Sequence, residues 1–560
     1  MRPPCDEAII RSGSIASPGK AEARTTWILA ATIIGSSMAF IDSTVVNVAL
    51  PALQANFHAT VVGVQWVVES YGLFLAALIL VGGSLGDLFG RRLIFVLGVA
   101  IFAVASLSCG AASNIHQLII ARSIQGVGAA LLVPGSLAII SAAFGEGSRG
   151  QAIGTWSGFT AITTAVGPVL GGWLVEHASW RWVFFINLPL AAATLAISLW
   201  QIPESRSAAG GHVDWLGALI ATLGLGGLIY GFIESVNTGW GNPAVLAGLI
   251  AGCSCLILFL IVEAKVTSPM VPLRLFASPV FSGTNLLTLF LYAAIGIFFF
   301  LFPLNLIQVQ GYSATAAGAA VLPLILLIFF LSRWSGGLVT HYGPRLPLII
   351  GPLVVALGFI LFAVPEVGGS YWRVFFPAVL VLGFGMAITV APLTTIVMNS
   401  VGPDRLGAAS GINNAVARVA GVLAIAVLGI VMVKAFSSRL NQSLHNLELP
   451  PAIVEMVRSN EIKLAGLQVP TELGPHNRAL LSASIGEAFV SGFRKVMLIC
   501  AGLSMAGSLV GSVMIPKNPN LGLSLVDPGG GRQGLHGGIN SARIALRLLR
   551  EYTNPKMWAG

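Results

Sequence analysis

Long apolar runs separated by short polar connections extend over most of the 560 residues. A helix needs roughly 20 apolar residues to cross the hydrocarbon layer of a bilayer. Repeated runs of about that length predict an all-α integral membrane protein. We predict fourteen spanning helices, at residues 27–50, 63–82, 93–112, 116–141, 153–175, 182–202, 213–233, 244–264, 281–306, 314–335, 346–365, 372–398, 406–434 and 490–515.

The composition supports the same class of protein. The chain is 56% hydrophobic and 9% charged, with a mean hydropathy of +0.87, whereas a soluble protein of this length needs far more surface charge. The net charge of +9 does not indicate nucleic-acid binding, because the basic residues are scattered through short loops. The five cysteines show no disulfide or metal-ligand spacing, so we expect no metal and no cofactor.

The distribution of basic residues predicts the orientation. With the N-terminus inside, thirteen Lys and Arg residues lie in the N-terminal segment and the inward connections, against only Arg181 and Arg373 in the short outward ones. This excess predicts a multi-pass protein of the inner (cytoplasmic) membrane with both termini in the cytoplasm. The long outward segment 435–489 is polar, and we expect a short helical hairpin over the exit.

An internal repeat divides the chain. Segments 57–63, 83–92 and 133–136 recur in similar form at 312–318, 336–345 and 391–394, at offsets of 255, 253 and 258. Two related bundles of this kind suit alternating access around a site at the midplane. The predicted parts are a tail (1–26), a six-helix bundle (27–202), two inserted helices (203–264), a second six-helix bundle (265–515) that contains the 435–489 segment, and a second tail (516–560).

Asp42 interrupts the first apolar run. A carboxylate at such a depth costs roughly 2.5–3.5 kcal/mol on insertion scales and marks a functional site by default. Because burial penalises the charged form, this carboxyl is a candidate proton carrier; the alternative is a structural hydrogen bond to a neighbouring helix. Small residues share its helical face at spacings of three and four: Gly35, Ala39, Val46 and Ala49.

Two more ionisable residues lie in predicted spans. Glu69 in the second span is a candidate for a second proton or for binding a cationic substrate, unless it lies wet near the outer mouth. Arg122 and Gln125 share a face of the fourth span. An arginine cannot be neutralised in a protein, so Arg122 needs a partner or water, or extends outward to the membrane edge.

Two glycine-rich motifs complete the pattern. The connection between spans 2 and 3 reads G-x-L-x-D-x-x-G-R-R, with Gly83, Asp87, Gly90, Arg91 and Arg92 at its defining positions. Span 5 contains a second set of small and bend-forming residues, which lets helices lie close together: Gly154, Gly167, Pro168, Gly171 and Gly172.

In this order, over residues 25–515, these motifs resemble the fourteen-helix drug:proton antiporter branch of the major facilitator superfamily, the EmrB/QacA-like efflux transporters. The resemblance implies a role for Arg122 in proton coupling together with Asp42. The family usually has an uncharged residue at the place of Glu69, so the coupling role expected of Glu69 rests on its charge within a span. The resemblance also implies a conformational switch at the 83–92 loop and export marked by span 5. Thr163 departs from the family pattern, which has glycine there. Polar candidates for lining a substrate path are Asn47, Gln65, Trp66, Gln125, Asn305, Gln308, Asn413, Asn414 and Arg418.

The sequence thus predicts a transporter, not an enzyme, that exports amphipathic small molecules such as antibiotics in exchange for protons. No P-loop is present, so the proton gradient is the expected energy source. Two alternatives stay open: an importer or permease of a specific metabolite with the same fold, and a transport-dead membrane receptor. The expected partners are protons, the bilayer and a small amphipathic substrate, with a periplasmic adaptor left undecided.

Overall fold

The computed structural model describes residues 18–517, apart from 145, 207–213, 267–268, 270, 402–405, 446, 448, 468 and 470–472. Most of the predicted tail 1–26 and nearly all of 516–560 lie outside these residues. The long helices are α2 (Pro18–Phe57), α3 (Val61–Phe89), α4 (Arg91–Ala111), α5 (Ile115–Ala143), α6 (Glu146–His177), α8 (Asn187–Gln201), α9 (Trp215–Thr238), α10 (Pro243–Lys265), α11 (Pro279–Leu304), α13 (Leu322–Gly336), α15 (Arg345–Phe362), α17 (Phe376–Asn399), α18 (Leu406–His445) and α20 (Pro475–Met514).

Short helices precede or join the long ones. The shorter elements are α7 (Trp182–Phe185), η1 (Leu273–Ala277), η2 (Asn305–Val309), α12 (Ala314–Ala319), α14 (Leu338–Tyr342), α16 (Tyr371–Val374), α19 (Pro451–Ser459) and η4 (Glu461–Gly466). Predicted spans 6 and 10 are therefore each built from two helices, α7 with α8 and α12 with α13. The described residues form helices only, as an all-α membrane protein requires.

Thirteen helices in the described part of the chain are long and apolar enough to cross a membrane. The predicted fifth span, 153–175, lies in α6, which is not among them by this measure. Its sequence is rich in Gly and Thr, which lowers its apolar character without shortening the helix. The total of fourteen stays a prediction.

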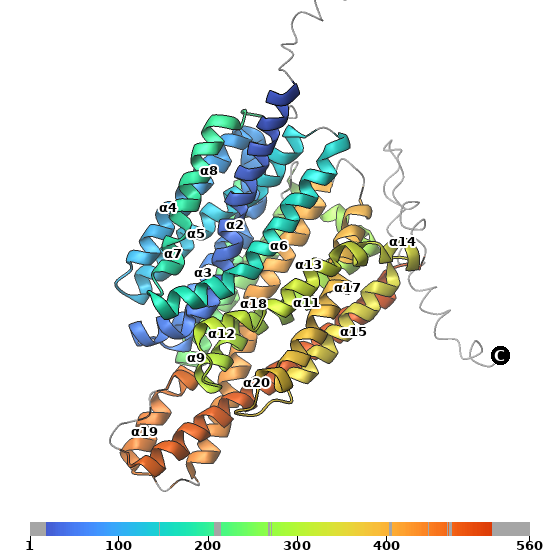
Figure 1. The fold of residues 1–560 in the computed structure, drawn as a ribbon. Coiled ribbons are helices and arrows are strands. Elements are labelled where there is room, and N and C mark those ends of the chain that lie inside the picture. The colour runs from blue at the N-terminus through green and yellow to red at the C-terminus, as the bar shows by residue number, and fades with distance from the viewer. Residues whose placement is uncertain are drawn as a thin grey trace, which may run out of the picture. The chain divides into compact units, whose positions relative to one another are not determined.

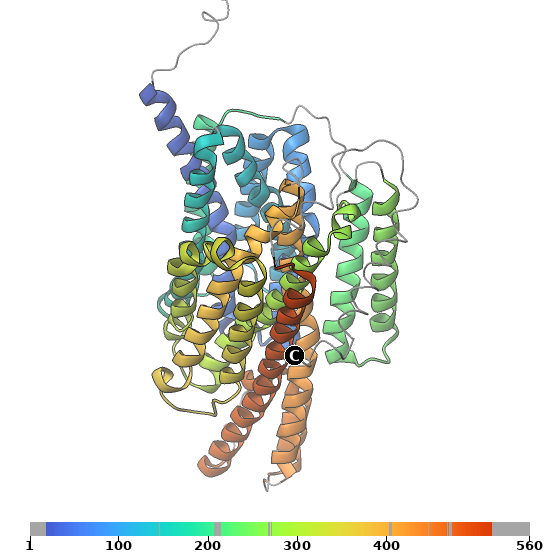
Figure 2. The same cartoon turned by 90° about the vertical axis from the view of Figure 1, so that its right-hand side faces the viewer.

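The helices pack in two groups, with a pair between them in sequence (Figures 1 and 2). In the first group α5 packs on α3 and α4, and α2 on α6 and α8; in the second α15 packs on α17 and α20, and α11 on α18 and α20. The inserted helices α9 and α10 pack on each other, and α9 also contacts α3 and α18. The domain boundaries given above stay a prediction.

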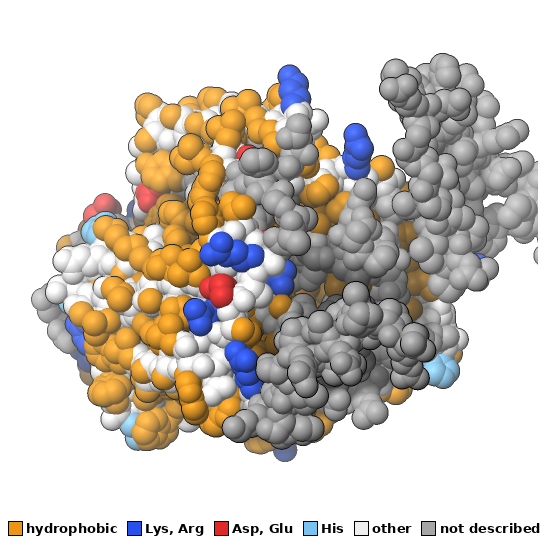
Figure 3. All heavy atoms as spheres, turned by 90° about the horizontal axis from the view of Figure 1, so that it is seen from above, with side chains coloured by type: hydrophobic (Ala, Val, Ile, Leu, Met, Phe, Trp, Pro, Cys, Tyr) orange, Lys and Arg blue, Asp and Glu red, His pale blue; other side chains and the backbone are white. Residues whose placement is uncertain are grey.

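The segment 435–489 contains more helix than its polar sequence indicates. α18 continues to His445 and α20 begins at Pro475, so both extend beyond the ends of the other helices (Figure 2). The expected short hairpin is thus formed by two long helices, with α19 and η4 between them. Following the predicted orientation, we call this end of the bundle outer and the end at which α2 begins inner. Figure 3 shows the inner end, where basic side chains are more prominent than acidic ones.

Candidate functional site

Asp42 lies in the interior of the first helix group, where α2 and α5 meet. Its side chain is fully buried, and Arg122 of α5 is 1% exposed. Arg122 Nη1 donates to Asp42 Oδ2 in a buried ion pair. The outward extension of Arg122 considered above is therefore wrong: the side chain turns into the bundle, because the carboxylate there supplies the partner that lipid does not.

Amide and hydroxyl groups surround this ion pair. Gln125 Nε2 donates to Asp42 Oδ1 (2.8 Å) and to Ser106 Oγ (2.8 Å), and Gln125 Oε1 accepts from Arg122 Nη1 (2.7 Å). Asn187 Nδ2 lies 3.3 Å from both Asp42 Oδ1 and Ser106 Oγ. Gln125, expected to line a substrate path, is instead part of this buried network. Ser106 and Asn187 were not predicted, because uncharged polar residues at these positions carry no distinct sequence signal.

The arginine itself is held from several directions. Arg122 Nε donates to the carbonyl oxygen of Val67 (3.1 Å), and its guanidinium carbon lies 4.2 Å from the ring centroid of Tyr71. Each of these contacts favours a positive charge at this point. Neutralising Asp42 would remove the anion that balances it, so protonation and the position of Arg122 are physically linked.

Glu69 lies on a different face of α3 from Val67 and Tyr71, which contact Arg122. Val62 and Leu73, seven residues before it and four after it, pack in one cluster with apolar residues of α9 and α18. Glu69 is fully buried, and neither carboxyl oxygen has a hydrogen-bond partner among the described residues. The wet position near the outer mouth is therefore wrong. Glu69 thus lies in the seam, by which we mean the contact of α3 in the first group with α9 of the inserted pair and α18 of the second group.

The second group contributes one cation to the region between the groups. Gly296 of α11 and Gly421 of α18 cross in close contact: a Cβ built on Gly296 would lie 2.6 Å from Gly421 Cα. One turn towards the inner end lies Arg418, which interacts electrostatically with Tyr71 and Tyr292. Its side chain is partly accessible, and no hydrogen bond or ion pair reaches it from the part of the chain that the structure describes.

The predicted switch loop is bound by the carboxylate of Glu204, a residue outside the sequence motif. Arg91 bonds to Asp87 one turn earlier (2.8 Å), whereas the backbone N–H groups of Arg92 and Leu93 both donate to the carboxylate of Glu204 (3.1 Å each). Gly90 has a φ of 127°, and a Cβ there would lie 2.6 Å from that carboxylate. Glu204 thus caps α4, where a carboxylate complements the helix dipole.

The C-terminal part of the span 5 motif, at Pro168 and Gly172, lies at the contact between the two helix groups. A Cβ on Gly172 would lie 2.2 Å from the carbonyl oxygen of Ala314, and one on Gly318 would lie 2.0 Å from that of Pro168. Gly167 and Gly171 approach α2 instead. The surroundings of Gly154 lie outside the described residues. Larger side chains at the contact would push α6 and α12 apart.

Polar contacts reinforce this outer contact. Thr315 donates to Glu176 Oε2 from its backbone N–H (3.2 Å) and its hydroxyl (2.5 Å). These two hydrogen bonds hold the pKa of Glu176 below its usual value. Gln308, expected to line a substrate path, donates to Gln54 Oε1 (2.9 Å) and so also joins the groups. Glu176, Thr315 and Gln54 were not predicted, since residues at helix ends are ordinarily solvated.

The remaining candidate lining residues are dispersed. Gln65 donates to the carbonyl oxygen of Ile425, and Trp66 Nε1 to Glu234 on the inserted helix α9. Asn305 accepts from Gln310, and Asn413 donates to Asn285 and Thr288 inside the second group. Asn47, Asn414 and Arg418 make no hydrogen bond to a different helix in the described chain. Asn47 is buried, Asn414 is exposed and Arg418 has intermediate exposure.

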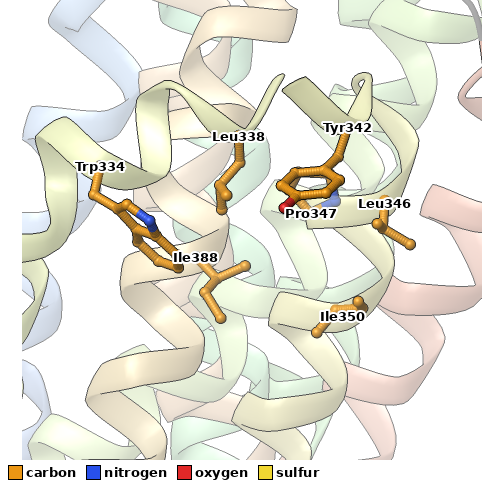
Figure 4. A pocket seen from close by; sticks show the side chains of 7 residues that line it. All are labelled: Trp334, Leu338, Tyr342, Leu346, Pro347, Ile350 and Ile388. Atoms are coloured by element: carbon orange, nitrogen blue, oxygen red, sulfur yellow. The ribbon is translucent and has the colours of Figure 1, made fainter. Parts of the chain in front are cut away.

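A pocket of about 210 Å³ lies between α13, α14, α15 and α17 (Figure 4). Its lining is apolar, and Trp334, Tyr342, Leu346 and Ile350 are exposed, so it belongs to the lipid-facing surface and not to the region around Asp42. In the described ranges, His, Cys, Asp and Glu residues nowhere gather in a group that could hold a metal ion.

Comparison with known proteins identifies the family. Residues 32–425 match the Major Facilitator Superfamily. The chain is 32% identical to the multidrug resistance protein Stp of Mycobacterium tuberculosis (strain CDC 1551 / Oshkosh), over 88% of this chain and 92% of that protein. It is 31% identical to the tetracenomycin C resistance and export protein of Streptomyces glaucescens, over 86% and 90%.

Solved structures show the same fold at low sequence identity. A bacterial homolog of the human lysosomal transporter Spinster, in an inward-facing and unoccupied conformation, aligns with a TM-score of 0.59 at 18% identity, covering 89% of this chain and 99% of that one. The inward-open xylose transporter XylE from E. coli aligns with a TM-score of 0.54 at 14% identity, covering 90% and 100%.

Proposed function

Since this chain belongs to the major facilitator superfamily, we propose that it exports amphipathic small molecules, among them antibiotics, by exchange for protons. The observation that carries the coupling is the buried Asp42–Arg122 ion pair with its ring of hydrogen bonds. A proton on Asp42 cancels the charge that Arg122 is held against, which favours a different packing of α2 and α5. The direction of transport is supported by relatives that are named for resistance and export.

Glu69 serves as a second proton site in this proposal. An ionised carboxylate without a partner in an apolar seam is strongly unfavourable, so the carboxyl is protonated in this conformation. Separation of α3 from α18 would admit water and let the proton leave. The outer end is joined by Glu176–Thr315 and Gln54–Gln308, which supports a state in which cargo enters from the inner side.

The protein is placed in the cytoplasmic membrane with both termini inside, as the excess of basic residues on inward connections predicts. The EmrB/QacA-like branch fits the fourteen predicted spans. The switch role of Asp87 and Arg91 is part of the same proposal, with Glu204 added as the cap that positions their loop. Whether an adaptor extends the path is left open.

The test is proton movement by the purified chain in liposomes that contain a pH-sensitive dye. The cargo is the toxic compound against which expression of this chain best protects a pump-deficient host in a survival screen. Asp42→Asn keeps the size of the side chain but cannot carry a proton, and we expect cargo-driven proton flux to fall to background. Glu263→Gln, which alters a buried acid on the peripheral helix α10, is the matched control and keeps the flux. Unchanged coupled export by Asp42→Asn would refute the assignment.

A further inference from the structure

Arg122 and Arg418 both lie in the interior, and only Arg122 is neutralised. Arg122 has a carboxylate, an amide oxygen and a backbone carbonyl as partners. Arg418 has none of these within the described residues. Asp42 is engaged by Arg122, and Glu69 is buried without a hydrogen-bond partner in the same residues. Arg418 is therefore a permanent positive charge between the two helix groups that no anion of the described chain balances.

Such a charge is costly inside a membrane protein. Intramembrane arginines pair with an acid or backbone oxygen, or they line the path of a substrate. A guanidinium that keeps access in the absence of such a partner has its donors available for something from outside the chain. Its planar fork matches an acidic group with two oxygens, which it binds in a bidentate manner.

The surroundings of Arg418 fit a flat, amphipathic molecule. Tyr292 of α11 lies in the same region and is partly accessible, so its ring can stack on an aromatic body. Tyr71 of α3 is buried, and the guanidinium of Arg122 covers its ring, so it offers no second surface. Asn414, one turn towards the inner end on the same face of α18, is exposed.

We propose that Arg418 binds the acidic group of the cargo, a carboxylate or sulfonate on an amphipathic aromatic body, where α18 faces the first helix group. This inference rests on the proposed export function and makes acids its preferred cargo, with their neutral analogues transported more slowly. It also explains why the second group carries no acid near this point: a carboxylate on α11 or α18 would compete with the cargo for Arg418.

The experiment compares two dyes that share one ring system. 1-Anilinonaphthalene-8-sulfonate is acidic, whereas N-phenyl-1-naphthylamine lacks the sulfonate. A small set of aromatic carboxylic acids with their methyl esters provides further matched pairs. Proton-driven uptake of each compound is measured in everted membrane vesicles that contain the full chain, with vesicles lacking a proton gradient as background.

We expect the wild-type protein to transport the acidic member of these pairs, and Arg418→Gln to slow that transport about tenfold or more while the neutral member changes less than about twofold. Arg418→Lys keeps the charge but not the fork, so its effect lies between the two. Normal abundance and thermal stability of both variants in detergent show that they fold.

Two results would overturn the proposal. One is an equal loss for acidic and neutral members, which assigns Arg418 to the conformational cycle. The other is acid transport that is absent in the wild type or unchanged in Arg418→Gln. Asp42→Asn keeps this test separate from that of proton coupling: it stops uptake of both members, whereas Arg418→Gln discriminates between them. A selective effect of Arg418→Gln together with an active Asp42→Asn would retain acid binding and reject Asp42 coupling.

Discussion

The two helix groups fill corresponding positions with opposite chemistry. The internal repeat offsets of 253–258 map Asp42 onto residues 295–300 and Arg122 onto 375–380, and Phe298 and Phe375 lie in these windows. Phe298, Phe302, Phe359, Phe362 and Phe375 are all fully buried and pack with ring-centroid distances of 4.8–6.0 Å, mostly edge to face. One group thus contains a hydrogen-bonded ion pair where the other contains an aromatic cluster.

The buried ion pair and the aromatic cluster differ in what they contribute to stability. Well-packed hydrophobic residues often stabilise a protein as well as a buried ion pair or better, because burying two charges carries a large desolvation penalty. The aromatic cluster shows that a helix group of this fold can be packed at this level with apolar side chains alone. Under the proposed function, the ion pair in the first group is retained because its charges carry proton coupling and not because it adds stability.

The largest effects are expected when the ion pair and the aromatic cluster are disrupted in separate variants. Arg122→Met leaves the Asp42 carboxylate buried without a balancing cation and should lower the free energy of unfolding by about 3–5 kcal/mol. Phe298→Ala should cost a similar amount, about 3–5 kcal/mol, through the cavity it creates. Only Arg122→Met should abolish proton-coupled export. Thermal unfolding in detergent and vesicle transport at a temperature where both variants are folded measure the two effects.

The double variant Asp42→Leu with Arg122→Met is the control. It removes both charges, so it should recover much of the lost stability while staying inactive. Loss of coupling in Phe298→Ala to the same degree as in Arg122→Met would show that the two groups are not functionally different.

A smaller effect is expected at Glu69. Because Glu69→Gln keeps the size of the side chain and removes no hydrogen bond among the described residues, it should change the free energy of unfolding by no more than about 1 kcal/mol, the centre of the range for single substitutions. The loss of one proton per cargo should lower equilibrium cargo accumulation about tenfold for each unit of pH gradient. Accumulation measured at several imposed gradients gives the proton ratio, and an unchanged ratio would exclude Glu69 from coupling.

The smallest effect concerns the outer contact. Hydrogen bonds from Thr315 lower the pKa of Glu176, so they favour its ionised form. Their contribution is complete above the ordinary pKa of a glutamate and is lost as the pH falls through the lowered value. The contact should therefore hold at neutral pH and loosen only in acid below about 4.5. Labelling of Ala314→Cys by an impermeant maleimide, expressed relative to labelling of free cysteine at the same pH because the thiolate fraction falls in acid, should rise in that range.

Glu176→Gln is the matched variant for this measurement. Its amide oxygen accepts less strongly than a carboxylate, so labelling should already be raised at neutral pH and should no longer depend on acid. Labelling that rises in acid to the same extent in Glu176→Gln would assign the pH dependence to a different group.

Residue by residue, prediction succeeded where chemistry is local. Helices α4 and α10 begin and end within about two residues of the predicted spans, because an apolar run of membrane length permits few other structures. Asp42 and Arg122 were identified as candidates because a charge in such a run is rare. The extensions of α18 and α20 could not be predicted from hydropathy, since outside the lipid a polar helix has no length requirement.

The sequence by itself determined the class of protein, the order of its helices and the residues whose charge is out of place in a membrane. Only the tertiary structure decided which of those charges are neutralised. Asp42 and Arg122 are 80 residues apart in the chain and meet in space, while Arg418 meets no acid in the described residues. The physical reason is that lipid penalises every buried charge alike, whereas compensation depends on which helix lies opposite, a matter of packing that no local pattern encodes.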